Sequence, residues 1–177
     1  MKRLKFKRFF ITLGIVYFCV VVQTSLLPLI EIASIRPNLI LIITASFGFM
    51  RGPKEGMFVG LFAGLMMDTL FGTVLGFYGL IYLVFGFLNG LFQQIYLDED
   101  IKLPILLISA TSFVYGLCIY LFHFVLRGEF AFFIYLNQII LPELIYTIAA
   151  TIGLYPLVLW VNRRLEAEEK RRASKFV

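Results

Sequence analysis

The sequence predicts an all-α integral membrane protein with six transmembrane helices, and three observations support this fold class. Of the 177 residues, 60% are hydrophobic and 15% are charged, and the mean hydropathy is +0.91. A soluble domain is about half apolar and about a quarter charged. Apolar runs of about 20 residues, the length that crosses a bilayer, follow one another along most of the chain. Six such spans leave too few residues for an additional soluble catalytic domain.

The first half of the chain contains four predicted spans. A basic N-terminus, MKRLKFKR, precedes an apolar run at 9–30 that is too long for a signal-peptide core and has no small-residue cleavage site after it. The second run is continuously apolar only from 39 to 50, so it reaches span length only when the segment is taken as 33–50. The third and fourth predicted spans are 57–75 and 76–97.

The second half contains two predicted spans and a polar tail. The fifth span is 103–126. The apolar stretch after it is longer than one span, so we expect 130–136 to lie at the membrane surface as an aromatic lead-in to a sixth span at 139–161. Residues 162–177 form a polar tail in which acidic residues precede basic ones by four positions, a spacing that favours a solvated helix. We interpret the chain as a single polytopic membrane domain.

The distribution of basic residues predicts the topology. Lysine and arginine near span ends favour the cytoplasmic side. With six spans and a cytoplasmic N-terminus, 14 of the 16 basic residues lie inside and only Arg36 and Arg127 lie outside. If 33–50 is not a span, the six basic residues of the tail move outside. Both termini are therefore predicted to be cytoplasmic in a multi-pass membrane protein, whose basic ends would also contact anionic lipid.

Only two of the eleven acidic residues, Asp68 and Glu143, lie inside apolar runs. A charge at the bilayer centre costs about 3 kcal/mol on insertion scales, so both need a partner or water. In the six-span topology Arg36 and His123 fall in the same outer half of the membrane as these acids. We expect either an internal ion pair, Arg36 with Asp68 or with Glu143, or a ligand or proton site in an outward-facing cavity. His123 is interpreted as an interfacial hydrogen-bonding residue.

Glycines recur every fourth residue in the third predicted span. Gly56, Gly60 and Gly64 form one face, and Asp68 continues it. Small residues let two helices approach closely in a membrane, so this face predicts tight packing against another helix, of this chain or of a partner. Ile81, in the next span, is expected to face lipid.

The sequence carries no pattern typical of an enzyme, a metal site, a cofactor site or a nucleic-acid-binding protein. Both cysteines lie in apolar runs without metal-ligand spacing, and no nucleophile motif or phosphate-binding loop occurs. The basic residues gather at the chain ends, which indicates topology and not a nucleic-acid surface.

The order of these features resembles the rod shape-determining protein MreD family of bacteria. The resemblance lies in RPNLI at 36–40, in the glycine-rich run GMFVGLFAGLMMD at 56–68 and in LPELIYT at 141–147, with YPL at 155–157 near the exit of the last span. It covers nearly the whole chain. It implies a non-enzymatic subunit of the cell-elongation machinery that binds the coiled-coil protein MreC. Through MreC it would be linked to the glycosyltransferase RodA, a class B penicillin-binding protein and, indirectly, MreB filaments.

Two other functions share this architecture. The substrate-capturing subunits of energy-coupling vitamin transporters have six spans and an outer-half site, and the MreD family is similar to them in fold. Those subunits dock on their coupling partner through an Ala-x-x-x-Ala signature, which this sequence lacks. A lipid-handling protein would use an outer cavity for a lipid head group.

We also expect that either an Arg36 pair or the transmembrane helix of MreC occupies the face formed by Asp68 and its glycines.

Overall fold

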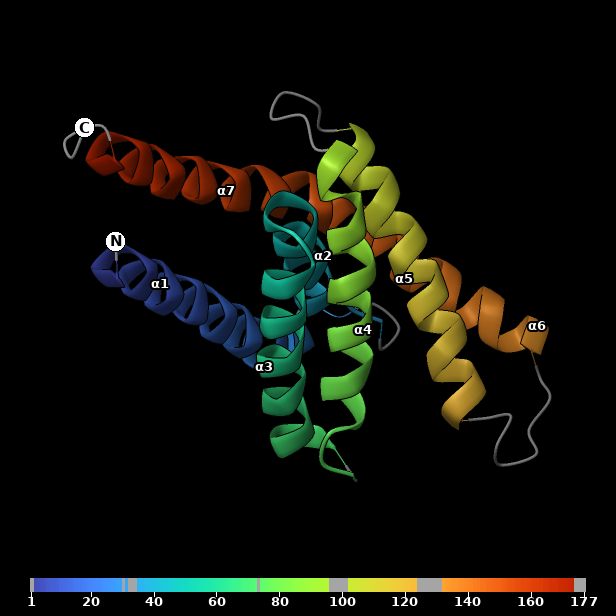
Figure 1. The fold of residues 1–177 in the computed structure, drawn as a ribbon. Coiled ribbons are helices and arrows are strands. Elements are labelled where there is room, and N and C mark those ends of the chain that lie inside the picture. The colour runs from blue at the N-terminus through green and yellow to red at the C-terminus, as the bar shows by residue number, and fades with distance from the viewer. Residues whose placement is uncertain are drawn as a thin grey trace.

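The computed structural model describes residues 2–29, 31, 35–72, 74–95, 102–123 and 132–173, and these ranges are mainly helical with no β-strand. The principal helices are α1 (Lys2–Val21), α2 (Leu39–Arg51), α3 (Pro53–Phe71), α4 (Phe77–Leu91), α5 (Lys102–His123), α6 (Phe132–Tyr135) and α7 (Leu141–Ala173). In Figure 1, α3 and α4 lie side by side, and the N-terminal end of α1 and the C-terminal end of α7 lie on the same side of the molecule.

Four helical stretches of the described chain are long and apolar enough to cross a membrane, which supports the predicted membrane protein. They are Lys7–Leu29, Phe77–Ile95, Lys102–Phe122 and Phe132–Glu168. Large apolar side chains such as Phe18, Leu80 and Ile145 are more than half exposed, as expected for a lipid-facing surface. The other two long helices differ: α2 has only 13 residues, and the 19 residues of α3 include three charged ones.

Helix α2 lies at the centre of the molecule and is buried on every side. All residues from Leu39 to Met50 are buried, and α2 packs against α1, α3, α4, α5 and α7. A helix that is apolar all round is expected in such a position. The predicted range 33–50 begins too early, because residues 35–38 are not helical and the side chain of Asn38 caps the helix.

Helices α3 and α4 pack in close contact through glycines. A Cβ added at Gly56, Gly60 or Gly64 would come within 3.0 Å of backbone atoms of α4, at Gly86, Tyr82 and Gly79 respectively. The face predicted from the four-residue spacing therefore packs within this chain. Ile81 does not face lipid as expected; it is 6% exposed and belongs to the core, whereas its neighbour Leu80 is exposed.

Two π-helical turns interrupt the helices, and a proline follows each of them. The Leu27 N–H donates to the Val22 carbonyl one residue before Pro28, and the Leu141 N–H donates to the Leu136 carbonyl one residue before Pro142. Proline has no N–H and clashes with the carbonyl four residues earlier, which a wider turn accommodates. Through the second π turn α6 runs on into α7, so the predicted lead-in at 130–136 is, from Phe132, part of one continuous helix.

Candidate functional site

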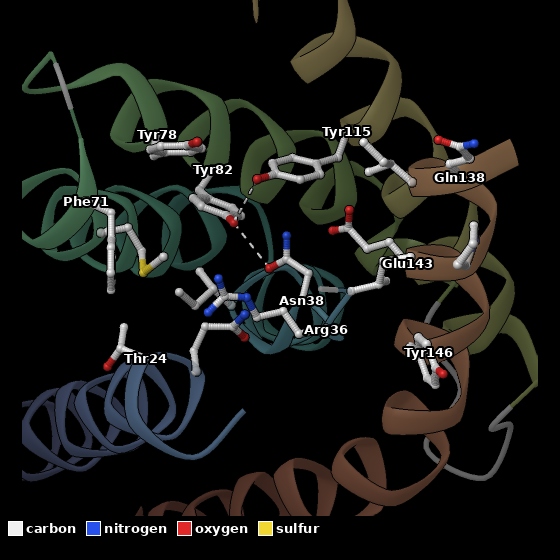
Figure 2. A pocket seen from close by; sticks show the side chains of 16 residues that line it. Thr24, Arg36, Asn38, Phe71, Tyr78, Tyr82, Tyr115, Gln138, Glu143 and Tyr146 are labelled. Carbon is white, nitrogen blue, oxygen red and sulfur yellow. Dashed lines mark hydrogen bonds between the residues drawn. The ribbon is translucent and has the colours of Figure 1, made fainter. Parts of the chain in front are cut away.

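A cavity of about 850 Å³ lies at the N-terminal end of α2. Its walls come from the first π turn, from the segment 35–38, from α2, α3, α4 and α5, and from the second π turn with the start of α7. Figure 2 shows Asn38 near its centre, with Arg36 and Glu143 on either side of it. The cavity therefore gathers polar groups from segments far apart in the sequence, inside a predominantly apolar molecule.

The floor of the cavity is the capped N-terminus of α2. The Asn38 side-chain oxygen accepts a hydrogen bond from the Leu41 N–H at 3.0 Å, and the Gln23 side-chain oxygen accepts from the Leu39 N–H at 2.8 Å. The Asn38 N–H donates to the Thr147 hydroxyl at 3.2 Å. The first turn of a helix leaves N–H groups without intrahelical partners, and water is not available to them in a bilayer. These side chains supply partners for three backbone N–H groups at this end.

A hydrogen-bonded chain of side chains links this floor to the wall formed by α4 and α5. The Tyr82 hydroxyl lies 3.2 Å from the Asn38 oxygen, to which it can donate, and 3.3 Å from the Tyr115 hydroxyl (Figure 2). The rings of Tyr82 and Tyr115 stack with centroids 5.5 Å apart, and Tyr78 stacks on Tyr82 at 6.4 Å. The rings of Tyr78 and Tyr115 therefore each pack on the ring of Tyr82, and the hydroxyls of Tyr82 and Tyr115 point toward one another.

Two charged residues line the cavity, Arg36 and Glu143. The Arg36 guanidinium lies 4.0 Å from a Glu31 oxygen, and both side chains are partly exposed. The Glu143 carboxylate faces the side-chain amide of Asn38. Within the described residues no cation lies within 4.0 Å of Glu143, and Arg36 pairs with neither of the acids expected for it.

Asp68 lies beside the cavity and caps α4. Its carboxylate accepts hydrogen bonds from the backbone N–H groups of Gly76, Tyr78 and Gly79 at 2.9–3.0 Å, and its side chain is buried. The N-cap residue of α4 is Gly76, which has φ +96° and no side chain to serve as a cap. The carboxylate thus takes the place of a local cap, and it also complements the positive end of the helix dipole. An Arg36 partner is not needed to satisfy it.

The remaining predicted site residue, His123, is the last residue of α5, and its side chain lies outside the described part of the chain. In the described ranges, no three histidine, cysteine, aspartate or glutamate side chains come together as metal ligands.

Sequence reasoning missed the residues that build the cavity floor and wall. Gln23 and the tyrosines of α4 and α5 lie within predicted apolar spans, so the apolar pattern does not single them out. A signal was available: a glutamine precedes a proline by four or five residues in both VQTSLLP at 22–28 and LNQIILP at 136–142. Both π turns contribute to the cavity wall, through Gln23 and Gln138 among others. Such turns occur frequently at functional sites.

A second polar cluster lies at the opposite end of α2, around Arg51. The Arg51 side chain is 2% exposed, and its Nε donates to the Asn162 side-chain oxygen at 2.5 Å. Its Nη1 contacts the Thr12 hydroxyl at 3.3 Å and the Glu55 carboxylate at 3.2 Å, and Glu55 also pairs with Arg8. The Arg51 cluster (Arg8, Thr12, Arg51, Glu55 and Asn162) thereby joins α1, the α2–α3 turn and α7. The sequence indicated only a topology signal at Arg51.

The candidate functions share one architecture, so the comparison with known families bears on the choice between them. The family model described as rod shape-determining protein MreD matches residues 4–164. The chain belongs to the MreD family. No curated protein and no solved structure matches the chain. The similarity to vitamin-transporter subunits therefore stays a prediction. The family match and the four helical stretches long and apolar enough to cross a membrane support a membrane protein of the MreD family.

Proposed function

We propose that this protein is a non-enzymatic scaffold subunit of the rod complex in the bacterial cell membrane, where it binds MreC and helps to organise lateral peptidoglycan synthesis. The observation that carries this proposal is the MreD family match over residues 4–164. RodA, a class B penicillin-binding protein and MreB would be reached through MreC. The chain would cross the membrane six times with both termini in the cytoplasm. The contact between Lys7 and Glu168, 2.7 Å, supports termini on one side.

In this proposal MreC binds outside the contact between α3 and α4. The glycine face of α3 contacts α4, and Asp68 bonds to the backbone of α4, so neither is available to a partner helix. We therefore propose that MreC binds another surface. The glycine face would contribute to this binding only indirectly, by keeping the α3–α4 pair rigid.

The test is recovery of partners from native membranes in mild detergent, with mass spectrometry of the proteins that accompany the tagged chain. Recovery of MreC together with wall-synthesis enzymes is the expected result. The variant Gly60→Leu should lose these partners, because the leucine overlaps the Tyr82 backbone. The matched control is Gly14→Leu, since a Cβ at Gly14 would have no atom within 4 Å. Intact, folded protein that recovers no MreC would overturn the proposal.

A second candidate function is favoured by the cavity. Its volume of about 850 Å³ lies within the range of small-molecule sites, which is compatible with a substrate-capturing transporter subunit or a lipid-handling protein. Recovery of a coupling membrane protein with paired ATPases, in place of MreC, would favour the transporter subunit.

A further inference from the structure

We propose that the cavity binds a zwitterion that joins a primary ammonium to a phosphate, as in the head group of an ethanolamine phospholipid. The ammonium would lie against Glu143 and the phosphate against Arg36. This proposal concerns a ligand and does not depend on whether the chain also serves as a scaffold for the rod complex.

Glu143 supplies the first argument, because it is a carboxylate in a membrane-spanning helix without a cationic partner. It lies in the apolar stretch Phe132–Glu168 and faces the Asn38 amide, and no cation among the described residues is within 4.0 Å. Intramembrane acids normally pair with a cation or mark a ligand or proton site. Since the carboxylate lines the cavity, a cationic group placed there would neutralise it.

Arg36 supplies the second argument. Its guanidinium lies at 4.0 Å from Glu31, the outer limit of an ion pair, and its side chain is 42% exposed. Arginine binds phosphate through two parallel hydrogen bonds, which a loosely paired guanidinium at a cavity wall can offer. Arg36 and Glu143 lie on opposite sides of Asn38 in Figure 2. One cavity therefore presents a cation and an anion to the same ligand, which favours a zwitterion over a ligand with a single charge.

The tyrosine wall favours a primary ammonium over a quaternary one. A quaternary ammonium is recognised by open aromatic faces. Here the rings of Tyr78 and Tyr115 each stack with the ring of Tyr82, and the polar contacts are made by the hydroxyl groups of Tyr82 and Tyr115. A primary ammonium donates three hydrogen bonds and suits the carboxylate of Glu143 with the side-chain oxygen of Gln138, which also lines the cavity.

The cavity rim favours a lipid as the source of this head group. Phe71 and Ile139 line the cavity, and their side chains are 60% and 37% exposed. In a protein surrounded by lipid, such residues give acyl chains an apolar surface next to the polar interior. A soluble zwitterion would gain nothing from that surface.

The experiment measures lipid binding to the purified full chain in detergent by native mass spectrometry. The probes are phosphatidylethanolamine, phosphatidylcholine and phosphatidylglycerol with identical acyl chains, and soluble O-phosphoethanolamine. We expect phosphatidylethanolamine to bind at least tenfold more tightly than the other two lipids. Glu143→Gln should weaken its binding at least tenfold, whereas Glu166→Gln, which exchanges a carboxylate of α7 outside the cavity, should not.

Three results would overturn the proposal: equal binding of all three lipids, unchanged binding in folded Glu143→Gln protein, or no binding by any probe. If Glu143→Gln does not fold, the variant Arg36→Gln is tested in its place, since the Arg36 side chain is exposed. Unchanged phosphatidylethanolamine binding by Arg36→Gln would equally overturn the proposed site. If O-phosphoethanolamine displaced phosphatidylethanolamine at an equal concentration, the result would support a zwitterion site. It would also show that the natural ligand is a soluble molecule and not a lipid. Recovery of MreC from membranes is a separate measurement, so failure of one proposal is distinguishable from failure of the other.

Discussion

Replacing Asp68 with asparagine tests whether this carboxylate holds the α3–α4 pair together as an N-terminal cap. One oxygen accepts from Gly76 and Gly79, and the other accepts from Tyr78. Asparagine retains one acceptor oxygen, so at least one of the three bonds is lost and an amide donor faces a backbone N–H. Losing a hydrogen bond to a charged group costs about 1.5–3 kcal/mol, and losing the charge at the helix N-terminus costs about 0.3–2 kcal/mol. We expect a loss of about 2–5 kcal/mol.

Thermal unfolding of the purified chain in detergent measures this loss. On the scaling for soluble proteins of this size, the expected fall in Tm is about 5–15 °C. The control is Glu166→Gln, because the single bond that Glu166 accepts from Asn162 can also be accepted by a glutamine oxygen. If Asp68→Asn unfolds within about 0.5 kcal/mol of the unmodified chain, the size of an ordinary surface substitution, the carboxylate is not the cap that the geometry indicates.

Three further changes test the packing and the two polar clusters. Gly60→Ala should lower stability by about 1–3 kcal/mol through overlap with the Tyr82 carbonyl, whereas Gly14→Ala, with open space around its Cβ, should leave thermal stability equal or slightly higher. Asn162→Leu should cost about 3 kcal/mol in a chemical unfolding experiment, because it removes the Nε acceptor of buried Arg51. Tyr82→Phe should cost about 1 kcal/mol in the same assay, since its hydroxyl lies between Asn38 and Tyr115, and an unchanged value would show that this chain of hydrogen bonds contributes little.

The apolar pattern predicted the helices well and their ends less well. Runs of apolar residues located α4 and α5, because a single continuous run of about 20 residues satisfies all its backbone groups in lipid by forming a helix. It could not locate the start of α2, where the decisive feature is the side chain of Asn38 as a cap. Nor could it show that 132–136 joins the last helix, because the π turn before Pro142 depends on backbone geometry that apolarity does not encode.

The candidate site was harder to predict, because partner choice depends on the fold. The sequence identified Asp68 and Glu143 as residues that need partners, and it suggested Arg36 for both on grounds of charge. The structure satisfies Asp68 with backbone N–H groups and leaves Arg36 near Glu31, a residue close in sequence. Counting charged residues cannot predict that backbone N–H groups will act as the donors. Every residue except proline carries a backbone N–H, so the sequence does not mark which of them will be used. The charge count singled out residues that need partners, but it could not assign those partners.

The cavity follows from the length of α2. Thirteen residues at 1.5 Å each extend about 20 Å, whereas the hydrocarbon core of a bilayer is about 30 Å thick. The five helices that pack against α2 are all longer, so protein can enclose space beyond its ends. The cavity lies at the N-terminal end of α2, and the π turns before Pro28 and Pro142 direct Gln23 and Gln138 to its wall. Asn38 caps the N-terminus of α2 and also forms the cavity floor. A substitution that extended α2 by one turn at this end would therefore remove the cap and fill the cavity at the same time.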